Sequence, residues 1–247
     1  MLLNIKNKLN IIDVYLCIFL FVFAFLLRLN YFSSLFTSSD NTAPVLYGMR
    51  LVLRPIFSLN FSDNPFLEII AYPYGFNMFF YYIFLLVVKF FNFFFNEFIA
   101  PLPLIFFGSL KIVFIYKIVR EYVDLERLKG FFIAFFFAVF PYFILRDYKF
   151  IQMQMICPST IFVIFLYYFL KFQTTHGKKF FYLSSLFCAI YIVSSNLNPG
   201  IFVFLCFLLL YFYKKDGKLN FNWTFFILPI LFILPYIAVH LFFVFKL

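Results

Sequence analysis

Residues 14–27 read VYLCIFLFVFAFLL, an unbroken apolar run that begins directly after Asp13 and ends directly before Arg28. A run of this length spans a bilayer once its flanking residues extend it toward the roughly 20 residues that a crossing needs. Lys6 and Lys8 precede the run, and no small-x-small cleavage site follows it. The pattern therefore favours an uncleaved signal-anchor helix over a cleaved signal peptide.

Apolar runs of this kind repeat along the whole chain. Of the 247 residues, 66% are hydrophobic and 12% are charged, whereas a soluble domain carries roughly 25% charged residues. The further runs are 76–95, 98–116, 131–145, 155–170, 180–193, 199–213 and 223–245. No single water-soluble core can absorb so many apolar segments. We therefore expect an all-α, polytopic transmembrane bundle of about seven or eight membrane helices, forming one membrane-embedded domain over residues 1–247.

The basic residues stand at the ends of the apolar runs. The formal net charge is +10, and this placement indicates topology signals and contacts with anionic membrane lipids, with no nucleic-acid partner. Four regions are basic: 1–10, 111–129, 171–179 and 214–218. The positive-inside rule assigns them to the cytoplasm and assigns the loops at 31–75, 146–149 and 194–198 to the outer side.

One segment conflicts with this simple topology. Two full crossings between residues 75 and 117 would carry the basic region 111–129 to the outer side. One of the runs 76–95 and 98–116 is therefore expected to be interfacial, re-entrant or otherwise not a simple crossing. The first of the two holds more polar residues and is the less typical membrane span.

The first outer loop, 31–75, is the longest polar stretch of the chain. Within it, residues 43–57 place apolar side chains on one helical face and Arg50 and Arg54 on another. This pattern predicts a helix that lies in the membrane interface. The alternative interpretation is an ordinary amphipathic loop helix without chemistry.

Carboxylates and cations share the predicted outer loops. They are Asp40, Asp63, Glu68 and Asp147, together with Arg50, Arg54, Arg146 and Lys149. Carboxylates and cations at one membrane face can deprotonate a hydroxyl group and stabilise a phosphate leaving group. The alternative is that outer loops simply need polar residues.

The order of these features is informative. Asp40 follows the first helix, and Glu68 comes shortly before the sequence Tyr72-Pro-Tyr-Gly. The pair Arg146-Asp147 precedes a later helix, and Asn198-Pro-Gly precedes another. This order resembles the membrane-embedded GT-C glycosyltransferases, in particular the bacterial branch with lipid A aminoarabinose transferases and protein O-mannosyltransferase-like proteins.

The resemblance implies a multi-pass protein of a bacterial plasma membrane. Such a protein moves a sugar from a polyprenyl-phosphate-linked donor to a lipid, glycan or protein acceptor on the outer side. By position, Asp40 would be the general base, and Glu68 and Asp147 would orient substrate or hold a divalent cation. Oxygen ligands suit Mg or Mn, although nothing in the spacing demands a metal. The residues implied in substrate binding are Arg50, Arg54, Tyr72, Arg146 and Asn198.

Departures from the family pattern keep other functions open. Tyr74 replaces the second Pro of the usual element, and Asn198-Pro-Gly lacks the usual Arg. Family members usually continue with more helices or an outer domain, so this chain is expected to be short or truncated. A non-catalytic membrane scaffold is therefore one alternative, and a transporter subunit is another. Ion-coupled transport usually needs ionisable residues near the bilayer midplane, and the later runs contain few of them.

Overall fold

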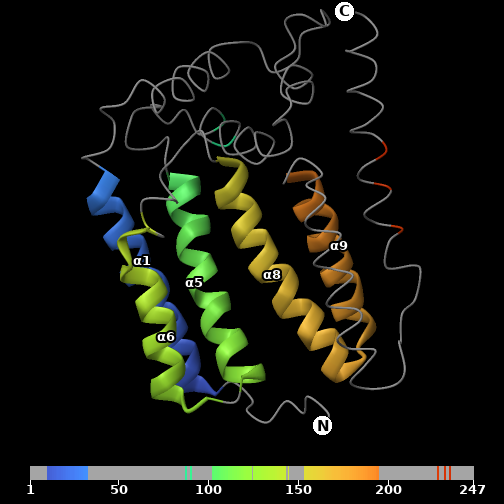
Figure 1. Ribbon diagram of the computed structural model, residues 1–247, viewed down its shortest axis with the longest axis horizontal. Helices are drawn as coiled ribbons and strands as arrows, with labels where there is room; N and C mark the ends of the chain where they lie inside the picture. The colour runs from blue at the N-terminus through green and yellow to red at the C-terminus, as the bar shows by residue number, and fades with distance from the viewer. Residues whose placement is uncertain are drawn as a thin grey trace, which may run out of the picture.

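The computed structural model describes residues 10–32, 102–123, 125–142 and 153–194, together with positions 87, 90, 144, 227, 231 and 234. Its helices are α1 (Ile11–Phe32), α5 (Leu102–Tyr122), α6 (Arg127–Val139), α8 (Met153–Thr175) and α9 (Lys178–Ser194). These described ranges contain no strand, which confirms the all-α prediction for this part of the chain. The labels follow Figure 1.

Each of the five described helices overlaps an apolar run predicted from the sequence. Two of them are long and apolar enough to cross a membrane, over Ile11–Asn30 and Leu102–Tyr122. At 1.5 Å per residue, such helices measure about 30 Å, close to the thickness of a bilayer's hydrocarbon core. The runs 199–213 and 223–245 fall outside the described residues, apart from isolated positions. The expected total of about seven or eight membrane helices stays a prediction.

Successive described helices alternate in direction (Figure 1). Helix α5 packs against α1 on one side and α8 on the other, α6 packs against α1 and α5, and α9 packs against α8. As a result, the first residues of α1 and α9 and the last residues of α5 and α8 lie together on one side of the bundle. We call this side the basic end. It is defined by Asp13, Arg120, Arg127, Lys171 and Lys178. We call the opposite end the far end.

Of the four basic regions, the structure describes parts of 111–129 and 171–179 and brings them together at one end of the bundle. The carboxylate of Asp13 at the start of α1 contacts Arg120 and Arg127, which belong to region 111–129. Glu121 of the same region contacts Lys171, which belongs to region 171–179. The assignment of this end to the cytoplasm stays a prediction.

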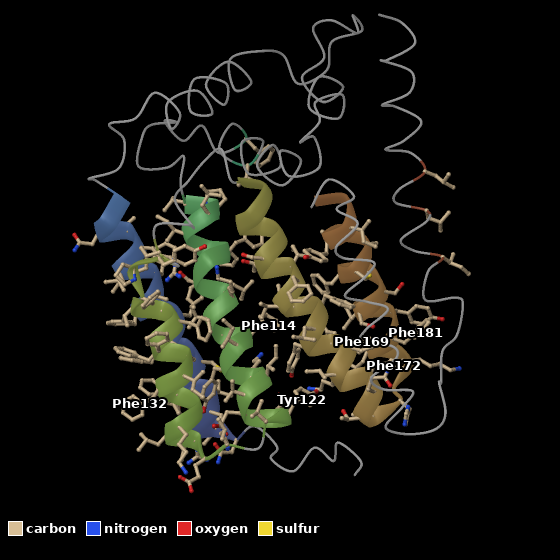
Figure 2. The ribbon with its side chains drawn as sticks, viewed as in Figure 1. Phe114, Tyr122, Phe132, Phe169, Phe172 and Phe181 are labelled. Carbon is tan, nitrogen blue, oxygen red and sulfur yellow. The ribbon has the colours of Figure 1, made fainter. Side chains whose placement is uncertain are left out.

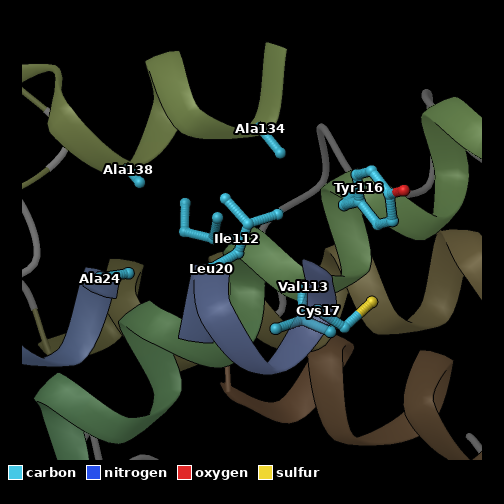
Figure 3. Close-up of a cluster of buried hydrophobic side chains, with 8 residues drawn as sticks. All are labelled: Cys17, Leu20, Ala24, Ile112, Val113, Tyr116, Ala134 and Ala138. Carbon is cyan, nitrogen blue, oxygen red and sulfur yellow. The ribbon is translucent and has the colours of Figure 1, made fainter. Parts of the chain in front are cut away.

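The core between α1, α5 and α6 combines Tyr116 with medium and small apolar side chains (Figure 3). The buried members are Cys17, Leu20, Ala24, Ile112, Val113, Tyr116, Ala134 and Ala138. On α6 the residues Gly130, Ala134 and Ala138 follow each other at intervals of four and therefore share one helical face. Small residues at this spacing let helix backbones approach closely.

Gly130 lies close to α5. A Cβ added there would lie 3.1 Å from Cδ of Arg120 and 3.5 Å from Cγ1 of Val119. We expect Gly130→Val to lower the free energy of unfolding by about 1–3 kcal/mol, because the larger side chain forces α6 away from α5. Gly130→Ala should change it by less than about 1 kcal/mol, because the gain in helix propensity offsets a small shift of the flexible Arg120 side chain.

Thermal unfolding of the purified protein in detergent measures both changes. Leu128→Val is the matched control, because Leu128 is 65% exposed on the same helix and its substitution should cost about 0.5 kcal/mol or less. An equal loss for Gly130→Val and Leu128→Val would contradict the close packing of α6 on α5.

A two-residue turn joins α8 to α9. His176 has a φ of 52°, and its N–H donates to the carbonyl of Phe172 at 2.8 Å. A residue in this left-handed conformation is a common way to end a helix. The carbonyl of Gly177 then accepts the N–H groups of Phe180 and Phe181 at 3.0 and 3.2 Å, which starts α9. The two helices are therefore joined as an antiparallel hairpin (Figure 2).

Candidate functional site

The residues that the sequence predicts to be functional lie outside the described residues. They are Asp40, Arg50, Arg54, Glu68, Tyr72, Arg146, Asp147 and Asn198. The predicted interfacial helix 43–57 lies outside them as well. Their roles therefore stay predictions, and the structure bears on them through the helix ends to which their segments are joined.

Those helix ends are all at the far end of the bundle. Helix α1 ends there at Phe32, before the segment with Asp40 and Glu68. Helix α8 begins there, after Arg146-Asp147, and α9 ends there, before Asn198. All the segments that carry predicted site residues are thus attached to one end of the bundle, opposite the basic end.

The same helix ends bear on the predicted topological conflict. Helix α1 ends and α5 begins at the far end, so the chain between them returns to the end that it left. The run 98–116 contributes most of α5, which extends from the far end to the basic end. The expectation of a run that is not a simple crossing then applies to 76–95. That run lies outside the described residues apart from positions 87 and 90, so the expectation stays a prediction.

At the basic end, Asp13 starts α1 through a reciprocal cap. The N–H of Asn10 donates to Oδ2 of Asp13 at 3.0 Å, and the N–H of Asp13 donates to Oδ1 of Asn10 at 3.1 Å. This arrangement is a capping box, in which two N–H groups without helical partners are satisfied by side chains. It explains why α1 begins at Ile11, three residues before the apolar run.

The other oxygen of Asp13 joins three helices. Its Oδ1 accepts the hydroxyl of Tyr116 at 2.6 Å, and it lies 3.4 Å from Nε of Arg120 and 3.2 Å from Nε of Arg127. The Asp13 side chain is fully buried and that of Arg120 is 7% exposed. Nη1 of Arg120 also donates to the carbonyl of Leu125 at 2.5 Å. A buried carboxylate needs this degree of satisfaction, since desolvation is costly. We call Asp13, Tyr116, Arg120 and Arg127 the Asp13 cluster.

A second cluster joins α5 to α8. The hydroxyl of Tyr167 donates to Oε1 of Glu121 at 2.9 Å and accepts Nζ of Lys171 at 2.9 Å. The same Nζ lies 3.7 Å from Oε2 of Glu121. Lys117 lies over the rings of Phe114 and Tyr167, with its Nζ 5.2 and 5.8 Å from their centroids. We call Glu121, Tyr167 and Lys171 the Glu121 cluster.

Polar side chains are also buried away from the basic end. Arg28 is fully buried near the end of α1 and donates to the carbonyl of Ala24 at 3.3 Å. Lys111, in the middle of α5, is 8% exposed. The hydroxyl of Thr160 on α8 donates to the carbonyl of Phe107 on α5 at 3.0 Å. An ionisable residue buried in such a helix marks a candidate functional position, and this applies to Arg28 and Lys111.

Sequence reasoning assigned Asp13, Arg28, Arg120 and Arg127 only to the flanks of apolar runs or to a basic region. For Asp13 a local signal exists, because Asn10-x-x-Asp13 before an apolar run is a helix-capping signature. The partners of Oδ1 of Asp13 are more than one hundred residues away along the chain, and no local pattern indicates them. The buried position of Arg28 follows from the packing of α1 and likewise has no local signature.

The described clusters hold the helices together and present no metal centre. Within the ranges given above, no group of three or more His, Cys, Asp or Glu side chains is placed to hold a metal ion. Comparison of the chain with protein families, curated proteins and solved structures finds no match. The function is therefore inferred from the residues and from the directions of the helices.

Proposed function

We propose that this chain is a multi-pass protein of a bacterial plasma membrane that transfers a sugar from a polyprenyl-phosphate-linked donor to a lipid, glycan or protein acceptor. One observation carries the proposal. The helix directions attach the segments with Asp40, Glu68, Asp147 and Asn198 to the far end of the bundle, while basic residues collect at the other end. A transferase of this type needs its carboxylates and its phosphate-binding cations at one face of the membrane.

The distribution of side chains supports membrane insertion. Large apolar side chains point outward on described helices, with Tyr15 65%, Phe132 58% and Val22 48% exposed. Charged side chains such as Asp13, Arg28 and Arg120 are buried instead. In water these large apolar side chains would be exposed to solvent, whereas soluble proteins rarely expose large contiguous apolar patches. In a bilayer the apolar surface faces lipid, and the polar groups are satisfied inside.

The proposed chemistry uses the far end. Asp40 takes the proton from the acceptor hydroxyl as it attacks the anomeric carbon of the donor sugar. The bond between that carbon and the phosphate oxygen breaks, and the cations Arg50, Arg54 or Arg146 stabilise the departing phosphate, which suits the guanidinium group. The lipid tail of the donor would lie in the bilayer, so a protein with little mass outside the membrane could bind it.

Transport is the second candidate function, and the burial of Arg28 and Lys111 favours it. A transporter must open alternately to both sides. The Asp13 and Glu121 clusters tie α1, α5, α6 and α8 together at the basic end, and these contacts would have to break in each cycle. These contacts weigh against a transport cycle in which the four helices separate at the basic end, and we therefore rank transport below transfer.

Reconstitution tests the proposed function. The purified chain is placed in proteoliposomes with radiolabelled polyprenyl-phosphate-linked hexoses or pentoses and a lipid extract as acceptor. We expect transfer of label to the extract above the level of empty liposomes. A folded, inserted protein that transfers none of these sugars to lipid, glycan or protein acceptors would contradict the transferase proposal and favour the scaffold alternative.

A further inference from the structure

Among the described residues, the basic end carries more cations than carboxylates. The described ion pairs at this end are Asp13 with Arg120 and Arg127, Glu121 with Lys171, and Glu126 with Lys129. Lys178 and Lys179, in the first turn of α9, are exposed and form no ion pair with any described residue. These two ammonium groups are therefore available to an anion outside the described part of the protein.

The two lysines stand on a rigid turn. The rings of Phe172 and Phe181 meet edge to face across it, with centroids 5.2 Å apart (Figure 2). Nζ of Lys171 lies 5.2 Å from the centroid of the Phe180 ring. The backbone bonds of His176 and Gly177 close both helix ends. The backbone that carries Lys178 and Lys179 is therefore held by these contacts, while both lysine side chains are exposed.

The surroundings of the lysines match a membrane surface. The first turn of α9 has no acidic residue, so the positive end of the helix dipole adds to the two ammonium charges. Tyr182, which follows them by one helical turn, is 60% exposed. Tyrosine and lysine together at a helix end are typical of the level of lipid headgroups.

We propose that the α8–α9 turn, through Lys178, Lys179 and Tyr182, binds the headgroups of anionic phospholipids in the leaflet at the basic end. The inference rests on the membrane insertion proposed above and not on sugar transfer. A lysine beside an anionic leaflet contributes about fivefold to binding, and two contribute roughly thirtyfold.

Lipid binding to the purified full chain in detergent tests this inference. Phosphatidylglycerol and phosphatidylcholine are the probes, and native mass spectrometry gives their apparent Kd. We expect K178Q/K179Q to weaken phosphatidylglycerol binding by roughly tenfold to thirtyfold and to leave phosphatidylcholine binding unchanged. Lys178→Arg with Lys179→Arg keeps both charges and should retain binding.

The matched single variants are Lys179→Gln and Lys129→Gln. Both remove one exposed cation from the basic end, but Nζ of Lys129 is 3.3 Å from Glu126. Because salt at 0.1 M screens charges beyond about 10 Å, a local headgroup site predicts about a fivefold loss for Lys179→Gln and less than about twofold for Lys129→Gln. Equal losses would indicate diffuse attraction by net charge, and no loss in any variant would overturn the inference outright.

Vesicle flotation separates the two proposals. A protein that floats with neither phosphatidylglycerol nor phosphatidylcholine vesicles would refute membrane insertion itself. A protein that inserts into both, without a preference for phosphatidylglycerol that depends on Lys178 and Lys179, would refute only the headgroup site.

Discussion

The Asp40→Asn variant should lose sugar transfer while the protein stays folded in the membrane. An amide keeps the shape of the carboxylate but cannot accept a proton at neutral pH. General base catalysis contributes about 10²–10⁴-fold to a rate, so turnover in the proteoliposome assay should fall by that factor. The amount of inserted protein and its thermal unfolding should match those of the unmodified chain.

Asp63→Asn is the matched control for this substitution. Asp63 lies in the same predicted outer loop, within the sequence Ser62-Asp-Asn-Pro, which is typical of a turn. This variant should keep most of the activity. Equal turnover of the Asp40→Asn and unmodified proteins would remove Asp40 from the mechanism and with it the main chemical support for a transferase.

The Asp13→Ala variant should show the largest loss of stability among the described residues. It removes a carboxylate that contacts both Arg120 and Arg127, and the buried Arg120 loses this ion pair. Removing one partner of a buried ion pair typically costs about 3–5 kcal/mol. The substitution also removes half of the capping box of α1, and such caps contribute about 1 kcal/mol. Thermal unfolding in detergent measures the change.

Glu126→Ala is the control for Asp13. Its carboxylate is at the same end of the bundle and contacts Lys129, but its side chain is 76% exposed. An exposed pair of this kind contributes about 0–1 kcal/mol. A double-mutant cycle of Asp13→Ala with Arg120→Ala should show a coupling above about 1 kcal/mol, because each single variant leaves the other charged group buried without its partner. Strict additivity, or equal losses for Asp13→Ala and Glu126→Ala, would refute the central role of Asp13.

The sequence predicts the helices better than it predicts their ends. The run 14–27 indicates α1, but the helix begins at Ile11 because the side chains of Asn10 and Asp13 cap it. Helix α5 begins at Leu102, so Pro103 stands in its first turn, where proline is tolerated. It continues to Tyr122 past the end of the apolar run, because Arg120 and Glu121 are paired with residues of other helices.

The clusters at the basic end could be predicted only in part. Charge indicates that regions 111–129 and 171–179 share one end, since both follow the positive-inside rule. It cannot indicate that Glu121 pairs with Lys171 or that Asp13 pairs with Arg127, because these contacts depend on which helices are neighbours. The candidate site at the far end rests on the order of motifs along the chain, and the structure adds the common end to which its segments are joined.

Two-sided cysteine labelling tests most directly whether the ends of the bundle lie on opposite sides of a membrane. Single cysteines replace Ser39, Lys149 or Lys179 in a variant without Cys17, Cys157, Cys188 and Cys206. In intact cells, a membrane-impermeant maleimide should label positions 39 and 149 directly and position 179 only after permeabilisation. Labelling of positions 39 and 149 from opposite sides, or of all three positions from the same side, would contradict a membrane-spanning bundle with one outer site.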